Sequence, residues 1–372
     1  MKIAYVHSIC MQHDAISNSL RDEIRWLMPA HEVHLFTYAC DHPDLPCTIV
    51  QNVEDLVLHP HFQQADLVVF HFGVYYPLFD AITICPYRAR RLVVFHNITP
   101  KAFVPLGDHD TVRRSFEQLS NLVFAHHVAC DSQTNLDVMR ECGINVPGTI
   151  LPLALHSSPT PPALKPSALD AKVRIAFIGR FVKSKGAGEL IAALDLLLQD
   201  DDKLCLQLDL VGNLKFSDLA LLEAIRLSIA RLHHAHGERI HVTIHGNASD
   251  EAKSQLLSDA DLFVLPTYHE GFCVPILEAL ASGCRVISYA NSNVPSISGG
   301  LATLLPTGDV AALAAAMGRD ARNITQPAWL GSGADSYRHH AEQAARYVAA
   351  FHPERIRRRF LTFLRDFSRN TF

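Results

Sequence analysis

Residues 173–188 read Val173-Arg174-Ile175-Ala176-Phe177-Ile178-Gly179-Arg180-Phe181-Val182-Lys183-Ser184-Lys185-Gly186-Ala187-Gly188. The first six residues form an apolar, β-branched run that is typical of a buried strand, and the glycines that follow indicate a turn. From Leu190 onward the apolar residues recur at helical spacing. A strand, a turn and a helix in this order are the repeating unit of parallel sheets with crossover helices, so the stretch predicts an α/β fold.

The same alternation of strand and helix patterns continues through the chain and predicts two parallel sheets. In the first half the strand patterns are Ile3 to Val6, Val33 to Tyr38, Asp66 to His71, Leu92 to His96 and Val128 to Asp131. In the second half they are Val173 to Ile178, Cys205 to Val211, Ile240 to His245, Leu262 to Leu265 and Arg285 to Tyr289. We therefore expect two doubly wound, Rossmann-like domains that face a central cleft, where the carboxyl ends of such strands bind ligands.

A proline-rich stretch divides the two halves, because its prolines exclude helix and donate no ladder hydrogen bonds. We expect an N-terminal domain over residues 1–158, a linker over 159–171 and a second domain over 172–349. Residues 323–336, with Pro327 and several glycines, are expected to form a loop.

The C-terminal segment 350–372 predicts a helix with one apolar and one basic face. Its apolar face is made of Ile356, Phe360, Phe363, Leu364 and Phe367. We expect this face to pack back on the N-terminal domain. The alternative is contact with an anionic membrane surface, here the inner face of the membrane.

The composition is that of an ordinary globular protein, with 48% hydrophobic and 19% charged residues in 372. A net charge of −5 gives no general attraction to nucleic acid, so no nucleic-acid partner is expected. No apolar run reaches the roughly 18 residues of a membrane span, and the N-terminus resembles a strand more than a signal peptide. These observations predict a cytoplasmic protein, with membrane association as the alternative.

Cysteine and histidine are frequent, yet neither forms a recognised metal motif. The nine cysteines include no CxxC pair, which favours reduced, buried thiols. The 22 histidines lack companion ligands at metal-binding spacing. Two DxD strings, Asp108-His109-Asp110 and Asp259-Ala260-Asp261, lie in a polar loop and at a helix end, respectively. We expect no metal site and no cofactor.

The loop after the strand Val173 to Ile178 has the features of an anion site. Backbone N–H groups at the start of the following helix and the positive end of its dipole favour negative charge. Arg180 and Lys185 add full positive charges. The loop is neither GxGxxG nor GxxxxGK[ST], so it predicts neither a dinucleotide site nor a Walker site.

Two carboxylates stand eight residues apart in the segment His269-Glu270-Gly271-Phe272-Cys273-Val274-Pro275-Ile276-Leu277-Glu278. Glu270 follows a buried strand pattern, and Glu278 lies on a helix that begins at Pro275. Eight helical residues span about 12 Å, whereas the paired carboxylates of a retaining glycosidase stand about 5 Å apart. The spacing suits the two ends of an extended ligand such as a nucleotide sugar.

The strings G-R-x-x-x-x-K-G and E-G-F-x-x-P-x-x-E-A, separated by an α/β stretch, resemble the retaining glycosyltransferases of the GT-B fold in the large family 4, glycosyl transferases group 1. The resemblance covers residues 172–320 closely and the first half by pattern. It implies that the N-terminal domain is the acceptor side and that the C-terminal domain binds a nucleotide-diphosphate sugar. It further implies transfer of a hexose, with mannose preferred, to a glycan or lipid-linked oligosaccharide in polysaccharide biosynthesis.

The resemblance also implies roles for individual residues. Arg180 and Lys185 would bind the donor diphosphate, Glu278 the ribose hydroxyls, and Glu270 would face the transferred sugar. Gly179 belongs to the cationic loop. The phosphate cradle would be completed by the backbone of Gly271, Phe272, Cys273 and Val274, and the base pocket by Gly246 and Asn247. Cys273 occupies a position where this family often has Gly, so a positive φ there would be strained.

In the N-terminal half, His96 is the candidate for the histidine beside the donor sugar, and a histidine that caps a strand-to-loop turn is the alternative. His71 is a second candidate on the acceptor side. The expected reaction is metal-independent transfer with retention, in which preorganised cations and helix amides stabilise the leaving diphosphate. The alternatives are a sugar phosphorylase or nucleotide-sugar epimerase on the same fold, and a non-catalytic nucleotide-sugar-binding protein.

Overall fold

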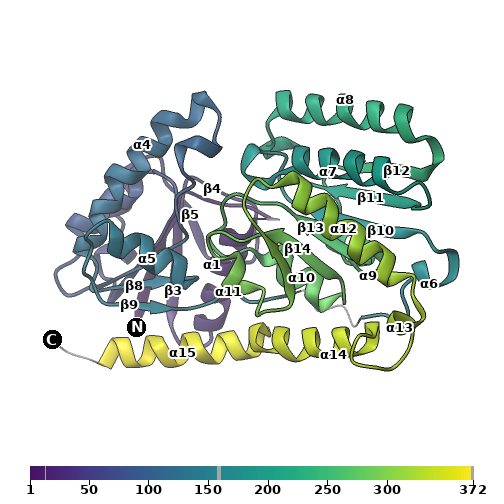
Figure 1. Ribbon diagram of the computed structural model, residues 1–372. Helices are drawn as coiled ribbons and strands as arrows, with labels where there is room; N and C mark the ends of the chain where they lie inside the picture. The colour runs from purple at the N-terminus through teal and green to yellow at the C-terminus, as the bar shows by residue number, and fades with distance from the viewer. Residues whose placement is uncertain (13, 157–160, 370–372) are drawn as a thin grey trace. The chain divides into compact units, whose positions relative to one another are not determined.

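The computed structural model describes residues 1–12, 14–156 and 161–369 (Figure 1). The chain forms two compact units: unit 1 consists of Met1–Lys101, Leu106–Ala154 and Phe351–Phe372, and unit 2 of Ala102–Pro105 and Leu155–Ala350. The predicted end of the first domain, the first residues of the predicted linker and the last three residues of the C-terminal segment lie outside the described residues.

Unit 1 is built on a parallel sheet. Its strands are β1 Lys2–Val6, β2 Ile9–Cys10, β3 Glu32–Thr37, β4 Ala39–Cys40, β5 Cys47–Ile49, β6 Leu67–Phe72, β7 Arg90–Phe95, β8 His127–Cys130 and β9 Gly148–Ile150. Among the described residues, seven of them form one sheet in the order β5-β3-β1-β6-β7-β8-β9, and β2 pairs separately with β4. The strand order reverses between β1 and β6, which makes this the switch point of the sheet.

Unit 2 repeats this arrangement. Its strands are β10 Val173–Ile178, β11 Leu206–Val211, β12 Ile240–His245, β13 Leu262–Leu265, β14 Arg285–Tyr289 and β15 Ala302–Leu305. Within the described part of the chain they form a six-stranded sheet in the order β12-β11-β10-β13-β14-β15, with every pairing parallel. Here the order reverses between β10 and β13. Two doubly wound parallel sheets are confirmed.

The helices up to α11 lie between successive strands, as crossover connections of parallel strands require, and α12 to α15 follow the last strand, β15. In unit 1 they are α1 Ala15–Leu27, α2 Val53–Val57, α3 Pro60–Gln63, α4 His109–Gln118, α5 Gln133–Glu141 and α15 Pro353–Arg369. In unit 2 they are α6 Ser167–Asp170, α7 Ala187–Asp200, α8 Leu219–His236, α9 Asp250–Asp259, α10 Val274–Ala281, α11 Val294–Ile297, α12 Val310–Ile324, α13 Pro327–Leu330 and α14 Tyr337–Val348.

All ten strand patterns found in the sequence correspond to strands, within one or two residues at their ends. The sequence analysis missed β2, β4, β5, β9 and β15, which have two to four residues each and lie in the small sheet or at a sheet edge. Strands this short carry too few residues for a periodic pattern. The expected loop over 323–336 was partly wrong, because it contains the short helix α13, held by the buried Trp329.

The long terminal helix α15 belongs to unit 1. Phe360, Leu364 and Phe367 lie in the same apolar core as Ile3 and Leu92, and the Phe360 ring lies 5.8 Å from that of Trp26 on α1. Burial of three such side chains contributes roughly 1.5–3 kcal/mol each. The exposed arginines of α15 include Arg355, Arg358 and Arg365.

The segment that leads into unit 2 is anchored by one lysine. The Lys165 side chain is buried, and its Nζ donates hydrogen bonds to the carbonyl oxygens of Leu257, Ser258 and Ser282. These carbonyls lie at the carboxyl ends of α9 and α10, where a cation is favourable. In the described part of the chain, no helix is both long and apolar enough to cross a membrane.

Candidate functional site

The candidate donor site lies at the carboxyl edge of the unit 2 sheet, on both sides of the switch point. The glycine loop Gly179–Gly186 follows β10, and the loop from Pro266 to Cys273 follows β13, the adjacent strand. In open α/β sheets ligands bind at this position. The two segments that the sequence motifs singled out are therefore neighbours in unit 2.

Close backbone approach explains why the first loop contains glycine. Gly186 has φ 71°, and a Cβ atom there would lie 2.1 Å from the carbonyl oxygen of Pro266. Both the backbone conformation and the space therefore require glycine. Further hydrogen bonds join the two loops, because the Ser184 carbonyl accepts from the Tyr268 N–H at 2.7 Å and from the Thr267 hydroxyl at 2.9 Å.

Lys185 and Glu270 form an ion pair across these two loops. Lys185 Nζ lies 2.6 Å from Glu270 Oε1, and the side chains are 19% and 7% exposed, respectively. A charge-assisted contact of this length in a largely buried place is among the stronger hydrogen bonds of proteins. It brings together the cation predicted to bind a diphosphate and the carboxylate predicted to face the sugar.

The turn into α10 has a left-handed backbone at Cys273, the position where a positive φ was expected to be strained. Cys273 has φ 78° and ψ 63°, in the left-handed region, and directly precedes the first residue of α10. The Asn293 amide supports the turn by donating a hydrogen bond of 2.9 Å to the Phe272 carbonyl. The Cys273 thiol is buried, and burial first and the Glu270 carboxylate second raise its pKa well above the usual value.

Glu278 lies one turn into α10, buried and paired with a lysine that the sequence analysis did not single out. Lys253 Nζ, on α9, lies 2.8 Å from Glu278 Oε1 and 3.3 Å from Asp250 Oδ1. Burial alone would lower the pKa of Lys253, but these two carboxylates raise it above the usual value. Glu278 is thus a buried carboxylate with a compensating charge.

The remaining predicted donor residues occupy adjacent loops of the same sheet edge. The Asn247 Oδ1, after β12, accepts from the Leu214 N–H at 3.3 Å, and Gly246 lies against the Leu214 side chain. A Cβ atom at Gly212, after β11, would lie 2.4 Å from the Gly179 carbonyl oxygen. The loops after β10, β11 and β12 therefore form one continuous rim.

Arg180 differs from the other predicted residues. Its side chain is exposed, and it makes no hydrogen bond or ion pair with the residues that the structure describes. The neighbouring Phe181 is buried, and its N–H donates to the Ser217 hydroxyl at 2.9 Å. The backbone next to Arg180 is therefore fixed while its guanidinium remains accessible. In the described part of the chain, no hydrogen bond or ion pair joins Arg180 to Lys185 or Glu270.

The two DxD strings have structural partners. Asp261 Oδ1 accepts from the Ser167 hydroxyl and Oδ2 from the Arg174 N–H at 2.8 Å, which ties α6 to β10. Asp110 pairs with Arg113 one turn further along α4 at 2.6 Å. Over residues 1–12, 14–156 and 161–369, no three His, Cys, Asp or Glu residues are grouped so that they could hold a metal ion.

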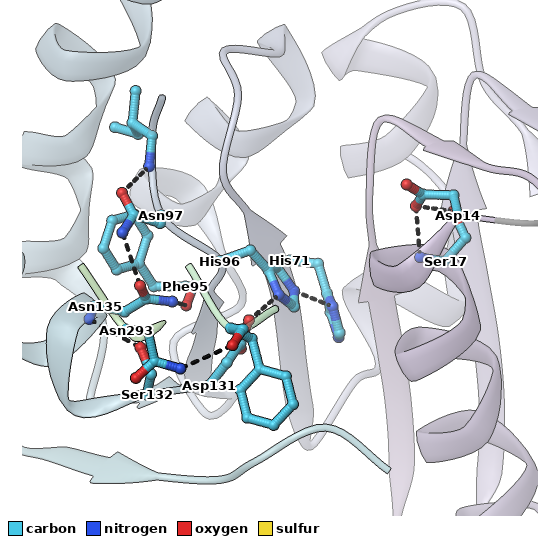
Figure 2. Close-up of polar contacts among 12 residues, drawn as sticks. Asp14, Ser17, His71, Phe95, His96, Asn97, Asp131, Ser132, Asn135 and Asn293 are labelled. Carbon is cyan, nitrogen blue, oxygen red and sulfur yellow. Dashed lines mark hydrogen bonds and ion pairs between the residues drawn. The ribbon is translucent and has the colours of Figure 1, made fainter. Parts of the chain in front are cut away.

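In unit 1, polar side chains line the carboxyl edge of the sheet near its own switch point (Figure 2). His96 follows β7 and is buried; its Nδ1 lies 3.0 Å from Asp131 Oδ2 and its Nε2 lies 2.9 Å from His71 Nδ1. Burial would lower the pKa of His96, but the Asp131 carboxylate raises it above the usual value. Asn97, with φ 78°, turns the chain away after His96 and donates to Asn135 Oδ1 at 2.8 Å.

The structure therefore places the predicted residues in two groups, one in each unit. The first group lies at one sheet edge of unit 2 or in the first helical turns that follow it: Gly179, Lys185, Gly246, Asn247, Glu270, Gly271, Phe272, Cys273, Val274 and Glu278. The second group is His96 and His71, which contact each other in unit 1. The sequence analysis missed Lys253 and Asp131. Asp131 is the last residue of a predicted strand, as His96 is, and this shared position was the available signal.

Comparisons with known proteins agree with this geometry. Residues 172–323 match the family model of glycosyl transferases group 1. The chain is 30% identical over 159 residues to the amylovoran biosynthesis glycosyltransferase AmsK of Erwinia amylovora, an alignment that covers 40% of this chain and 36% of that protein. It is 35% identical over 74 residues, 19% of this chain, to an MMP α-(1→4)-mannosyltransferase of Mycolicibacterium hassiacum, of which 18% is covered. The chain thus matches about a third or less of the length of these curated relatives.

The likeness in three dimensions extends over the whole chain. The sucrose-phosphate synthase of Thermosynechococcus elongatus superposes with a TM-score of 0.73 at 19% identity, covering 99% of both chains. At this level of identity the likeness concerns the fold. The two parallel-sheet units have the fold of GT-B glycosyltransferases, and residues 172–323 match glycosyl transferases group 1.

Proposed function

We propose that the protein is a retaining glycosyltransferase that moves a hexose from a nucleotide-diphosphate sugar to a glycan or lipid-linked acceptor. The observation that carries the proposal is the Lys185–Glu270 pair at the switch point of unit 2, within the segment that matches glycosyl transferases group 1. Lys185 supplies a cation for the leaving diphosphate, and Glu270 a carboxylate beside the sugar.

The proposed chemistry follows from the charge that develops in the reaction. When the anomeric carbon becomes oxocarbenium-like, negative charge accumulates on the leaving diphosphate, and preorganised donors there lower the barrier. Lys185 and the exposed Arg180 supply this stabilisation, together with the backbone of Gly271 to Val274 at the start of α10. These groups act without a divalent ion in the proposed reaction. Glu278, at the other end of the ligand, binds the ribose hydroxyls.

The proposed substrates rest on the relatives. A mannosyltransferase and an enzyme of amylovoran biosynthesis are among them, which favours mannose as the hexose and a pathway of polysaccharide biosynthesis. The partners are then the sugar nucleotide and the glycan acceptor, with no nucleic acid. The exposed arginines of α15 favour peripheral contact of a cytoplasmic protein with the inner face of the membrane.

A donor screen followed by product analysis tests the proposal. Thermal shift with UDP-, GDP- and ADP-sugars identifies the donor, and NMR of the product gives the anomeric configuration. Lys185→Ala and Glu270→Gln are expected to remain folded and to lose at least about 100-fold in kcat, as expected when one preorganised charge is removed. Lys183→Ala, an exposed lysine of the same loop, is the matched control and keeps wild-type turnover.

The same samples separate the alternative activities. A nucleotide-sugar epimerase converts the donor without an acceptor, and a phosphorylase needs inorganic phosphate. A binding protein shows the thermal shift and forms no product with any acceptor. Full turnover in Lys185→Ala and Glu270→Gln, or product of inverted configuration, contradicts the proposed reaction. Unchanged turnover in EDTA is expected.

A further inference from the structure

The histidine pair of unit 1 continues into a buried polar chain that the proposed function does not use. His71 Nε2 lies 3.2 Å from Glu23 Oε2 on α1, and the Tyr5 hydroxyl donates to the same oxygen at 3.1 Å. Side chains from α1, β1, β6 and the ends of β7 and β8 therefore form one continuous row, Tyr5–Glu23–His71–His96–Asp131. Tyr5 and His71 have no exposed surface, and the other three are less than a tenth exposed.

We propose that Glu23 and His71 form a proton relay that sets the protonation state of His96 from the interior of unit 1. Both ring nitrogens of His96 are engaged by Asp131 and His71, so the charge of His96 is coupled to what His71 can donate or accept. Glu23 and His71 are thus positioning residues.

Two hydrogen-bonding states are compatible with every side-chain contact along the row. In the first, His96 is an imidazolium that donates from Nδ1 to Asp131 and from Nε2 to His71 Nδ1, while His71 donates from Nε2 to the Glu23 carboxylate. In the second, the His96 Nε2 proton has moved to His71 Nδ1, and the His71 Nε2 proton has moved to Glu23 Oε2. The number of protons is the same in both, so the charge relocates between His96 and Glu23 without exchange with solvent.

Burial or charge raises the pKa of each group that exchanges the charge, Glu23 and His96. Burial raises the pKa of Glu23 to about 8, and the Asp131 carboxylate raises that of His96. Burial lowers the pKa of His71 well below its usual value, so His71 remains neutral in both states and serves as the bridge. A carboxyl and an imidazole shifted in this way can compete for one proton near neutral pH.

Two groups beside the row, His7 and Tyr76, hydrogen-bond to the backbone carbonyl of His71. His7, after β1, lies 3.1 Å from the His71 carbonyl through Nδ1, so it donates there, and burial lowers its pKa to about 3. The Tyr76 hydroxyl donates to the same carbonyl at 2.8 Å. Three further charged groups lie near the row. Asp22 acts on Glu23 and Asp14 on His96. Asp22 and Arg359 also line a small cavity of about 20 Å³ beside Glu23 and Asp131.

Histidine NMR on the full chain tests the relay without any substrate. Protein labelled with ¹⁵N-histidine is titrated from about pH 5 to 10, and the ring nitrogens are assigned with His71→Asn and His96→Asn. In the wild type, His96 is expected to titrate in two steps, because two groups share the protons, and His71 to exchange between tautomers. In Glu23→Gln, His96 titrates in one step at lower pH and His71 keeps one tautomer.

The matched control is Glu32→Gln, which removes a carboxylate 3.5 Å from His61 in the same unit. It should change the His61 signals and leave those of His71 and His96 as in the wild type. Tyr5→Phe is a second, milder variant: loss of its hydrogen bond favours the protonated Glu23, so His96 becomes charged only at lower pH. A wild-type titration of His96 in both Glu23→Gln and Tyr5→Phe would overturn the relay.

The consequence for turnover rests on the proposed function. For the role of His96 that the family resemblance implies, Glu23→Gln should shift one limb of the pH profile of kcat/KM for sugar transfer, while Glu32→Gln leaves it unchanged. The two outcomes are separable, because absence of transfer with any donor refutes the proposed function while the NMR result stands. If Glu23→Gln turns over with an unshifted pH profile, the relay has no part in the reaction.

Discussion

Lys253 Nζ lies 2.8 Å from Glu278 Oε1, so a lysine of α9 neutralises the helix-mounted carboxylate at the far end of the candidate donor site. The Glu278 side chain is 8% exposed, and burial of a charge is costly unless it is paired. Lys253 therefore provides the compensating charge at the position where the ribose is proposed to bind.

Lys253→Met should destabilise the protein by about 1–3 kcal/mol, less than a fully buried pair because the lysine is 21% exposed. Urea denaturation measures the change. The double variant Lys253→Met/Glu278→Gln should recover part of the loss, because no unpaired charge remains. Lys203→Met, at an exposed position, is the control. Equal stability of the Lys253→Met and Lys203→Met proteins would argue against a structural role for the pair.

Gly186, at the end of the glycine loop, and Gly188, in α7, should respond differently to alanine. Gly186→Ala is expected to cost at least about 2 kcal/mol and to reduce donor binding, because the added Cβ lies 2.1 Å from the Pro266 carbonyl oxygen at a positive φ. Gly188→Ala meets no atom within 4 Å and lies in α7, so it should be neutral or stabilise by up to about 1 kcal/mol. Thermal denaturation and donor-induced shifts distinguish the pair.

Cys273 offers a measure of backbone strain at the start of α10. A non-glycine residue in the left-handed region costs about 1–2 kcal/mol. Cys273→Ala keeps the strain and loses the buried thiol, whereas Cys273→Gly loses the thiol and removes the strain. The glycine variant should therefore be more stable than the alanine variant by about 1 kcal/mol in chemical denaturation. The reverse order would mean that packing of the side chain outweighs the backbone conformation.

Stability should fall as pH rises through the range in which Glu23 binds a proton in the folded state but not in the unfolded state. Burial raises the folded pKa from 4.5 to about 8, so the native protein binds more protons between these values and its stability decreases with pH there. The upper limit of the effect is on the order of 4 kcal/mol. Glu23→Gln removes this contribution. Parallel curves of Tm against pH for wild type and variant would contradict it.

The sequence was most informative where the chain has long, repeated patterns. The central strands β10, β13 and β14 of the unit 2 sheet are nearly continuous apolar runs because helices cover both faces, and these runs located the strands with their observed ends. The glycine loop and the Glu270 segment could be assigned to one site because each follows a central strand, and neighbouring parallel strands end at the same edge.

Which side chains pair with each other was harder to predict from the sequence. Lys253 lies 25 residues from Glu278, and Glu23 lies 48 residues from His71, with no spacing rule that connects them. Asp261 shows the opposite case: its DxD string suggests a ligand, but the carboxylate holds Ser167 and the Arg174 backbone. Such contacts depend on how helices cross the sheet, which a pattern along one element does not contain.

The Lys185–Glu270 contact also bears on which anions can bind at the candidate donor site. Lys185 and Glu270 are already paired at 2.6 Å. A diphosphate that binds Lys185 must therefore displace the Glu270 carboxylate from the Lys185 ammonium group. Simple anions in the cell are then poor competitors, because they gain too little to break that contact. The proposed sugar nucleotide would do so by giving Glu270 a hydroxyl group in exchange, so that binding would depend on both its diphosphate and its sugar.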